Sequence, residues 1–286
     1  MLFTIAIPTY NNAKTVSKAI ESAINQDYKD EYEVLIVNNA STDNTAEVLS
    51  QYKENAIVRV ETNEKTVDLF ENHNVCFEKA KGDYVLFIHS DDELFPFALS
   101  VLEERIRQRH YPPRYILWGH SMLYDFQEYI RIGNQQVNTV FSGTNAIASF
   151  LVGGLTPSGT CYSKNSILEI GGFPPMKSKV TPNDWFILIW AAFNCFEFEM
   201  MDRMIYKRFL SGTASMVSTK RNEDIANLEM FSILFEKLND LQKKRLLNII
   251  YIKGGLRLVL LLKDHYSNAQ ILKLRIKKRF HSLFSF

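Results

Sequence analysis

The first third of the chain alternates short apolar segments with helical patterns, and this alternation restricts the fold more than any other feature. Four segments have the composition of buried strands: Phe3–Ile7, Val34–Val37, Val58–Val60 and Tyr84–Ile88. Strands that are apolar along their whole length, rather than at every second position, are typical of parallel sheets covered on both faces. We therefore expect an α/β fold with a Rossmann-like, mostly parallel central sheet flanked by helices.

Helical patterns fill the intervals between these segments. After Asn11, apolar residues recur at the spacing of one helix face. Asn44 and Glu47 have the spacing of a capping box and predict the start of a second helix. A third helix is expected over Val67–Lys79, with Gly82 ending it.

Clusters of polar residues follow three of the four strand segments. They are Pro8-Thr9-Tyr10-Asn11, Asn38-Asn39-Ala40-Ser41 and His89-Ser90-Asp91-Asp92-Glu93. The carboxyl ends of parallel strands meet at one edge of a sheet, and α/β folds bind their ligands there. The three clusters therefore predict a single site at this edge.

The last of these clusters contains three consecutive carboxylates, Asp91, Asp92 and Glu93. Their charges repel one another unless a cation offsets them, and Mg²⁺ or Mn²⁺ takes carboxylate ligands together with substrate phosphates. The alternative is the acidic N-terminus of a helix that begins near Leu94. Because the glycine-rich loops G-x-G-x-x-G and G-x-x-x-x-G-K-[ST] are both absent from the sequence, a metal ion is favoured for handling a nucleotide's phosphates.

The pattern is less regular beyond residue 100. Tyr115–Trp118 has the composition of a strand, Trp185–Met201 that of a buried helix running into a strand, and the chain after residue 215 that of helices. Asn183 or Asp184 is placed to cap the buried helix. Two sets of side chains are expected in structural roles: the tryptophans Trp118 and Trp190, and the histidines His73, His110 and His120.

Three blocks of the sequence, in their order and spacing, resemble the nucleotide-binding half of the family-2 glycosyltransferases. They are Thr4–Asn11 (TIAIPTYN), Tyr32–Thr45 (YEVLIVNNASTDNT) and Ala80–Asp92 (AKGDYVLFIHSDD). Ile170–Phe173, followed by Asn183–Trp185, resembles the acceptor-side block of the same family. The similarity extends over about residues 3–215. It implies a GT-A-type fold and the transfer of a sugar from a nucleoside diphosphate, as in bacterial surface-polysaccharide glycosyltransferases.

The resemblance also implies roles for single positions in the donor site. Pro8, Thr9 and Tyr10 would line the nucleobase pocket. Asn38 stands where the family usually has an Asp that faces the base. The amide oxygen of Asn38 can still accept a hydrogen bond from a uracil N–H, whereas its NH₂ group could serve another base.

His89, Ser90 and Asp91 overlie the Asp-x-Asp motif of the family. Asp91, with Asp92 beside it, would bind the ion, Mn²⁺ or Mg²⁺, that bridges the diphosphate. His89 replaces the first Asp of the motif and so removes one negative charge near the ribose and the metal.

Further positions are implied on the acceptor side. Asp184 falls at the general base of inverting members, although a helix cap is the alternative. Trp185 is a candidate for lining the acceptor pocket, and Lys207 and Arg208 for approaching the diphosphate. Leu210 stands where many relatives carry a His.

The charge of the chain is unevenly distributed. Residues 241–286 hold eleven Lys and Arg against one Asp, a formal charge of +10 that leaves −9 on the rest of a chain whose total is +1. Basic residues mixed with Leu, Ile and Phe suit the interface of an anionic membrane. Packing of this segment on the acidic body is the main alternative. Nucleic acid is disfavoured because no RNA-recognition motif accompanies the charge.

Two parts are expected along the chain. Residues 1–215 would form the glycosyltransferase domain, with a nucleotide-sugar-binding half over 1–93 and an acceptor-side half over 94–215, and residues 216–286 a basic helical extension. Three distant cysteines and a start without a secretory pattern predict a cytoplasmic protein, peripheral on the inner face of the cell membrane.

The predicted function is that of an inverting, metal-dependent hexosyl- or N-acetylhexosaminyltransferase. The resemblance implies a UDP-linked sugar as its donor and a glycan or lipid-linked hydroxyl in O-antigen or capsule synthesis as its acceptor. Two alternatives remain at this point. A nucleotidyltransferase would normally need a basic, glycine-rich loop near the N-terminus, which this chain lacks. A non-catalytic nucleotide-sugar-binding protein on the same fold is made plausible by Asn38, His89 and Leu210.

Overall fold

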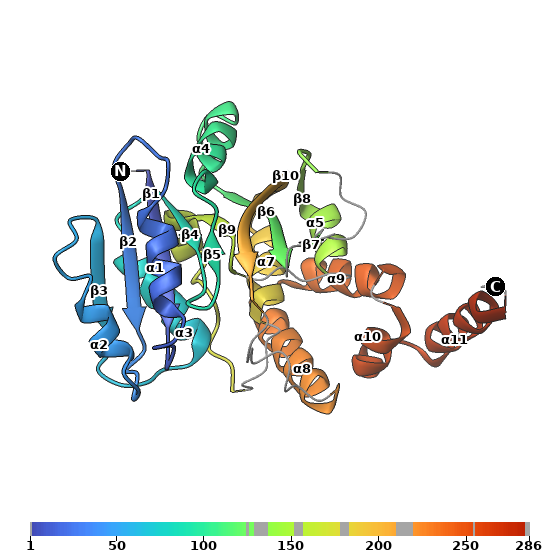
Figure 1. Cartoon of the computed structure of the whole chain (residues 1–286). Coiled ribbons are helices and arrows are strands. Elements are labelled where there is room, and N and C mark those ends of the chain that lie inside the picture. Colours follow the sequence, from blue (N-terminus) through green and yellow to red (C-terminus); the bar gives the residue numbers. More distant parts are fainter. Residues whose placement is uncertain are drawn as a thin grey trace.

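The N-terminal half of the central sheet has the parallel arrangement that the sequence predicts. This computed structural model describes residues 2–123, 126–128, 137–151, 157–177, 183–209, 220–253 and 255–283. In it β1 (Phe3–Thr9) lies between β2 (Tyr32–Asn38) and β4 (Tyr84–Phe87), and β3 (Val58–Thr62) pairs with β2. All of these pairings are parallel, so the carboxyl ends of the strands point to one edge, the lower one in Figure 1.

Helices cover both faces of this half-sheet, which explains why its strands are apolar at nearly every position. α1 (Val16–Ile24) and α2 (Thr45–Ser50) contribute to the core on the face of Ile5 and Ile7, and α3 (Leu69–Lys79) contributes to the core on the opposite face. β1 and β2 are buried at all their residues. Each fully buried Val, Leu or Ile side chain stabilises the fold by roughly 1.5–3 kcal/mol.

The helices begin close to the predicted positions, but the predicted capping box does not form. Asn44 is the N-cap residue of α2, yet its side chain makes no capping hydrogen bond. Instead Oδ1 of Asp43 accepts from the backbone N–H of Thr45 at 2.9 Å. α3 begins two residues later than predicted, and Oδ1 of its N-cap residue Asp68 accepts from two backbone amides of the first turn.

Gly82 has a different role from the predicted one. α3 already ends at Lys79, so Gly82 does not end it. A Cβ atom on Gly82 would lie 2.5 Å from backbone atoms of Phe3 and Thr4, and the Gly82 N–H donates to Oγ1 of Thr4 at 2.9 Å. A side chain is therefore excluded here by the close approach of β1.

The second half of the sheet is mixed. Its order continues that of the first half as β3-β2-β1-β4-β9-β6-β10-β5. β9 (Thr160–Ser163) runs antiparallel to both β4 and β6 (Tyr115–Leu123), whereas β10 (Glu197–Arg208) runs parallel to β6 and antiparallel to β5 (Glu93–Leu94). The short strands β7 (Phe126–Glu128) and β8 (Val140–Ser142) pair with β6 and β10.

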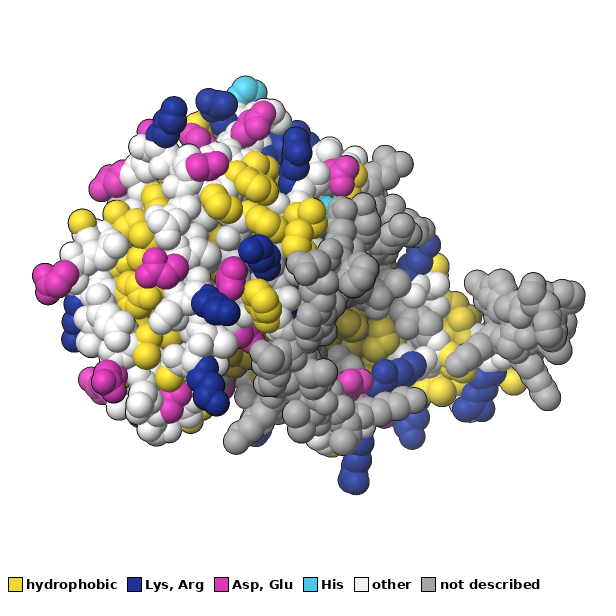
Figure 2. Space-filling view, in the orientation of Figure 1, with side chains coloured by type: hydrophobic (Ala, Val, Ile, Leu, Met, Phe, Trp, Pro, Cys, Tyr) yellow, Lys and Arg dark blue, Asp and Glu magenta, His cyan; other side chains and the backbone are white. Residues whose placement is uncertain are grey.

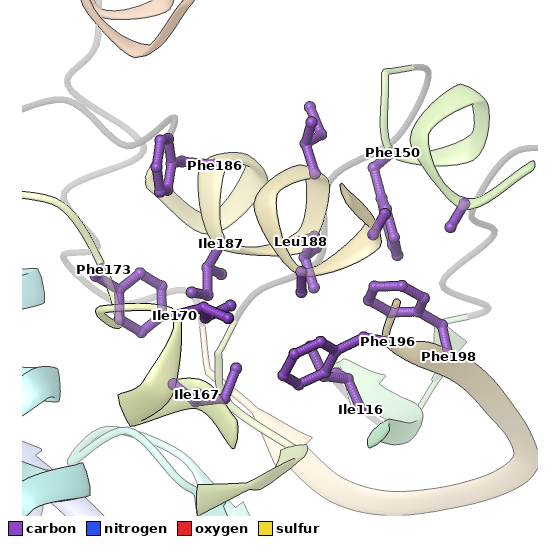
Figure 3. Close-up of a cluster of buried hydrophobic side chains, with 14 of the residues drawn as sticks. Ile116, Phe150, Ile167, Ile170, Phe173, Phe186, Ile187, Leu188, Phe196 and Phe198 are labelled. Atoms are coloured by element: carbon purple, nitrogen blue, oxygen red, sulfur yellow. The ribbon is translucent and has the colours of Figure 1, made fainter. Parts of the chain in front are cut away.

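The predicted buried helix that runs into a strand is confirmed as α7 (Asn183–Phe193) followed by β10. Figure 3 shows Phe186, Ile187 and Leu188 of α7 among the aromatic and aliphatic side chains of the larger core. Trp118 is buried in this core, and Trp190 packs against it with its indole N–H donating to the Ile170 carbonyl, as expected of structural residues. The other helices of this half are α4 (Ala98–Gln108), α5 (Gly143–Phe150) and α6 (Lys164–Glu169).

The C-terminal segment is helical, as predicted. It comprises α8 (Lys220–Lys237), α9 (Asp240–Lys253), α10 (Gly255–Leu261), a 3₁₀ turn (Lys263–His265) and α11 (Asn268–Leu283). Side chains of α8, α9 and α10 belong to the same core as α5 and α7; they include Met230, Phe231, Leu234, Leu246, Ile249, Ile250, Leu258 and Val259. Packing on the body therefore holds for α9 and α10.

α11 differs from its neighbours because it projects away from the sheet (Figure 1). Its Ile271 and Leu274 are partly buried against the core, whereas Leu272 is exposed. In the face shown in Figure 2, basic and hydrophobic side chains lie together over the C-terminal helices at the right. Within the described residues, no helix combines the length and the apolar character that crossing a membrane requires.

Candidate active site

The cluster after β4 brings an imidazole and two carboxylates together. His89, Asp91 and Asp92 each offer a ligand atom, and these atoms lie within 4.8 Å of one another. Burial raises the pKa of Asp91, and it raises that of Asp92 to about 7, with the neighbouring Asp91 charge adding to the effect. One nitrogen and several carboxylate oxygens match the donors that divalent ions take in proteins, and such an ion would offset the crowded charge.

Asp92 also ties two distant segments to this cluster. Its Oδ2 accepts from the Ser158 hydroxyl at 2.6 Å, and its Oδ1 accepts from the backbone N–H of Phe209 at 3.1 Å. The Ser158 hydroxyl in turn accepts from the backbone N–H of His89 at 3.2 Å. Ser158, two residues before β9, and Phe209, the residue after β10, are thus both fixed beside the turn at residues 89–92.

A second histidine lies behind the first. Nε2 of His73, on α3, is 3.3 Å from Nε2 of His89, and Nδ1 of His73 donates to the Leu69 carbonyl at 2.7 Å. Burial lowers the pKa of His73 to about 3 and that of His89 to about 4, so both rings are neutral near pH 7. A structural role is expected for His73, and the structure adds its contact with His89, which lies sixteen residues away on another element.

The carboxyl ends of β1 and β2 form the adjoining part of the edge. Pro8 pairs with Val37 and Thr9 with Asn38 in the register of the two strands. Thr9 and Asn38 are buried, whereas Tyr10 is 44% exposed. Oγ1 of Thr9 is buried and has no hydrogen-bond partner among the described residues.

Hydrogen bonds organise the loops at this edge. Oδ1 of Asn38 accepts from the backbone N–H of Ser41 at 3.1 Å, which closes a tight turn after β2. Nδ2 of Asn12 donates to the Ser90 hydroxyl at 2.6 Å. This contact joins the loop after β1 directly to the acidic cluster, so the predicted convergence of the three polar clusters is present in the structure.

Asp184 lies in the first turn of α7. The residue as a whole is partly exposed, but its Oδ1 is buried and has no hydrogen-bond partner within the described part of the chain. Burial raises the pKa of this carboxyl to about 7, and the charge of Arg208 acts in the opposite direction. A carboxyl group with this pKa exchanges a proton readily near neutral pH. Trp185, beside it, packs partly buried against the larger core.

Arg208, the last residue of β10, links the two acidic groups. Its positive charge lowers the pKa values of Asp91, Asp92 and Asp184, and also that of His89. Lys207 instead lies 3.8 Å from a carboxylate oxygen of Glu93 and 5.6 Å from the Phe95 ring centre.

Among the positions singled out in the sequence, the structure thus assembles Asp91, Asp92, Asp184 and Arg208 with His89, and it directs Lys207 elsewhere. Leu210 lies outside the described residues. Sequence reasoning missed His73 and Ser158. Ser158 has no local signal beyond its place in a glycine- and proline-rich stretch, because its partner Asp92 is 66 residues away.

Comparison with known proteins places these features in a family. The family model described as "Glycosyl transferase family 2" matches residues 4–124. The poly(ribitol-phosphate) β-N-acetylglucosaminyltransferase TarS of Staphylococcus aureus is 35% identical over 114 residues, which are 38% of this chain and 20% of TarS. The Escherichia coli enzyme WfaP, a UDP-Glc:α-D-GlcNAc-diphosphoundecaprenol β-1,3-glucosyltransferase, is 33% identical over 91 residues, or 32% of this chain and 36% of WfaP. The matches therefore span about a third or less of these relatives.

Solved structures extend the likeness to the fold of nearly the whole chain. TarS 1–349 in complex with UDP has a TM-score of 0.67 at 20% identity, over 88% of this chain and 71% of that one. The mannosyltransferase PcManGT of Pyrobaculum calidifontis, in complex with GDP-Man and Mn²⁺, has a TM-score of 0.61 at 13% identity, over 99% of this chain and 81% of that one. The predicted GT-A-type α/β fold is confirmed.

The sequence match over the first half of the sheet and the shared fold beyond it agree with each other. Residues 4–124 match the model of glycosyl transferase family 2, and the chain resembles the bacterial glycosyltransferases of surface-polysaccharide synthesis.

Proposed function

We propose that this chain is an inverting glycosyltransferase that moves a sugar from a UDP-linked donor to a hydroxyl of a glycan or lipid-linked acceptor. The observation that carries the proposal is the arrangement around Arg208. The charge of Arg208 acts on Asp91 and Asp92 and also on Asp184, whose buried Oδ1 has no partner among the described residues. In such a site Asp91 and Asp92 can hold an ion at the leaving diphosphate, and Asp184 is a separate carboxyl group for the acceptor.

The donor would bind along the edge formed by β1, β2 and β4. Pro8, Thr9 and Tyr10 would line the nucleobase pocket with Asn38, while His89 and Ser90 would lie between the ribose and the ion. The buried Thr9 hydroxyl, which lacks a partner among the described residues, is available to a bound base. The complexes of TarS with UDP and UDP-GlcNAc support a UDP-linked donor.

Asp91 and Asp92 would hold Mn²⁺ or Mg²⁺ beside the diphosphate. A bound divalent ion offsets the negative charge that develops on the departing diphosphate. Arg208 would add a fixed positive charge at the same place, since it already lies within electrostatic range of both carboxylates. The Mn²⁺ in the PcManGT complex and the ligand geometry of the cluster support an ion here. Lys207, held by Glu93, would have a smaller part.

Asp184 would act as the general base. Its Oδ1 takes the proton of the acceptor hydroxyl while the hydroxyl oxygen forms a bond to the anomeric carbon and the bond from that carbon to the diphosphate breaks. A single displacement of this kind inverts the anomeric configuration. The pKa of about 7 suits the role, because a base works best when its pKa is near the working pH. Trp185 would line the acceptor pocket.

The C-terminal part of the chain would determine where in the cell the enzyme is held. We assign residues 1–215 to the transferase domain, with halves 1–93 and 94–215, and residues 216–286 to a helical extension that packs on it. The basic outer surface of this extension, α11 above all, would hold a cytoplasmic enzyme at the inner face of the cell membrane. Reversing the exposed charges Lys273 and Arg275 to Glu should then weaken co-sedimentation with anionic vesicles about tenfold or more, since each basic residue near such a surface contributes about 1 kcal/mol. Unchanged binding would remove α11 from this role.

A donor screen tests the transferase itself. The purified chain is incubated with UDP-, GDP- and TDP-sugars, Mn²⁺ or Mg²⁺ and a lipid-linked acceptor fraction, and release of the nucleoside diphosphate is measured. We expect release from a UDP-sugar that EDTA abolishes and that Asp91→Ala reduces to background. Asp30→Asn is the matched control, because Asp30 is an exposed aspartate before β2, at the opposite edge of the sheet.

The alternatives give different products in the same screen. A nucleotidyltransferase would release pyrophosphate from a nucleoside triphosphate. A binding protein would retain UDP-sugars without cleaving them. If no nucleoside diphosphate is released from any donor when an acceptor is present, the proposed function is contradicted.

A further inference from the structure

We infer that His89 is a direct nitrogen ligand of the divalent ion, that His73 holds it in the ligating orientation, and that the site in consequence prefers Mn²⁺ and Co²⁺ to Mg²⁺. The inference rests on the proposed function only in assuming that an ion occupies the cluster of His89, Asp91 and Asp92. It adds the atom that binds, the residue that positions it and the class of ion that is selected.

The proton positions on His73 follow from its surroundings. A backbone carbonyl only accepts hydrogen bonds, so Nδ1 of His73, at 2.7 Å from the Leu69 carbonyl, must carry a proton. Nε2 of the neutral ring then has a lone pair and no proton. His73 is fully buried among the rings of Phe70, Phe87 and Phe173, at centroid distances of 5.6, 4.9 and 5.7 Å. These contacts and the bond to its own helix fix the ring.

The state of His89 follows in turn. Its Nε2 faces the lone pair of His73 Nε2 at 3.3 Å, and only a proton on His89 makes that contact attractive. In the neutral ring of His89 the remaining nitrogen, Nδ1, therefore has a lone pair and no proton. Such a nitrogen repels a phosphate oxygen and attracts a metal ion. A histidine that binds a metal almost always donates its other N–H to a fixed acceptor, and His73 is that acceptor here.

The donor set then decides between ions. Mg²⁺ binds through oxygen atoms in a regular octahedron and loses water reluctantly, whereas divalent ions of the first transition series also accept imidazole nitrogen, with an affinity that rises from Mn²⁺ to Co²⁺. With His89 the protein offers one nitrogen and the oxygens of two carboxylates. An aspartate at position 89 would instead make a set of oxygens only and would add one negative charge. Compared with an aspartate, the histidine thus lowers the affinity for Mg²⁺ relative to the affinities for Mn²⁺ and Co²⁺.

Binding of the metals alone tests the inference without any turnover. The affinities of the full chain for Mn²⁺, Co²⁺ and Mg²⁺ are measured by titration, and pulsed electron paramagnetic resonance of bound Mn²⁺ is examined for coupling to a directly bonded ¹⁴N. We expect ¹⁴N coupling in the unaltered protein and none in His89→Asp. We also expect the ratio of Mn²⁺ to Mg²⁺ affinity to fall tenfold or more in that variant.

Three further variants separate positioning from packing. His73→Phe keeps a ring in an aromatic environment but removes the acceptor, and should weaken Mn²⁺ binding roughly 10- to 100-fold, as loss of a ligand's hydrogen-bond partner typically does. His73→Gln restores an acceptor atom near the place of Nε2 and should bind Mn²⁺ within about threefold of the unaltered chain. The control is His110→Gln, at an exposed histidine after α4, which should change nothing.

Absence of ¹⁴N coupling in the unaltered chain, or an unchanged ion preference in His89→Asp, would overturn the inference. If His73→Phe fails to fold, the spectrum of the unaltered chain and the His73→Gln and His89→Asp titrations still decide. UDP release, assayed separately, reports on the proposed function. Release without ¹⁴N coupling overturns the inference alone, whereas coupling without release supports it and leaves the proposed transferase in doubt.

Discussion

The two halves of the sheet reach the same edge by different means. In the first half, β3-β2-β1-β4 run parallel and each polar loop follows its strand directly, so chain direction alone brings the loops together. In the second half β9 runs antiparallel to its neighbours, and Ser158, Asp184 and Arg208 arrive from the start of one strand, the start of a helix and the end of another strand. Packing of α7 and β10 on the common core, together with the hydrogen bonds of Asp92 to Ser158 and to the Phe209 amide, sets their positions.

The halves also differ in how their polar groups are satisfied. The loops of the first half hold one another through bonds such as Asn12 to Ser90 and Ser41 to Asn38. The second half presents Asp184 with a buried oxygen that has no partner among the described residues. The difference indicates that the loops of the first half are preorganised for binding and that the second half supplies a carboxyl oxygen free to accept a proton.

The sharpest test of this division is Asp184→Asn. The variant keeps the shape of the side chain but cannot take a proton, so transfer should fall roughly 10²–10⁴-fold, the usual contribution of a general base. UDP binding, measured by calorimetry, should stay within about twofold because the donor platform is untouched. Transfer at a near-normal rate would assign Asp184 to helix capping alone.

Substitutions of two neighbouring basic residues of β10, Arg208 and Lys207, test whether only Arg208 acts on the site carboxylates. Arg208→Gln removes the charge that acts on Asp91, Asp92 and Asp184, and should lower kcat about a hundredfold. Lys207→Gln, one residue earlier, breaks only the partly exposed contact with Glu93 and should change kcat less than about threefold. Equal effects of the two substitutions would contradict the separate roles.

The pH dependence of transfer should report Asp184 when it is measured at saturating divalent ion, because the bound ion keeps Asp92 ionised although burial raises its pKa to about 7 as well. Asp184 must be ionised to accept a proton, and burial raises its pKa to about 7. The rate should therefore fall about tenfold for each pH unit below about 7 and level off above it. UDP binding should be less sensitive between pH 6 and 8. A rate that is flat down to about pH 5 would show that the base has an ordinary carboxyl pKa.

Gly82→Ala probes the first half, where we expect effects on stability and not on chemistry. The added Cβ would lie 2.5 Å from backbone atoms of β1, which cannot yield as a flexible side chain does. Overpacking of this kind typically costs about 1–3 kcal/mol. Urea unfolding should show that loss, with kcat per folded molecule nearly unchanged. Full stability would mean that β1 and the turn before β4 adjust easily.

Sequence reasoning succeeded where local pattern and chain direction are sufficient. The apolar segments predicted β1 to β4, and the polar residues after them predicted the edge at which Thr9, Asn38 and Asp91 lie. It also located Asp184 and Arg208, but only through resemblance to the family. Nothing in the local sequence places either residue near Asp91, because that proximity depends on the crossing of α7 and β10 over the core.

What the sequence did not reveal has one origin. Asn44 has the spacing of a cap, but the side chain of Asp43, one residue earlier, accepts the bond. His73 lacks a neighbour at ligand spacing along the chain, while His89 reaches it across the gap between α3 and the end of β4. Both cases turn on contacts of a few ångströms that residue type and spacing do not encode.

The burial of α8, α9 and α10 in the core has a consequence for protein engineering. One such use is to graft the sheet domain of this chain onto another protein. A graft whose junction lies just after β10 would strip the core that α5 and α7 share with Met230, Leu246, Ile250 and Val259. The resulting chimera would expose to solvent the apolar side chains with which α7, the helix that carries Asp184, packs on these residues. Workable junctions should therefore lie beyond α10, in the short connection that leads to α11.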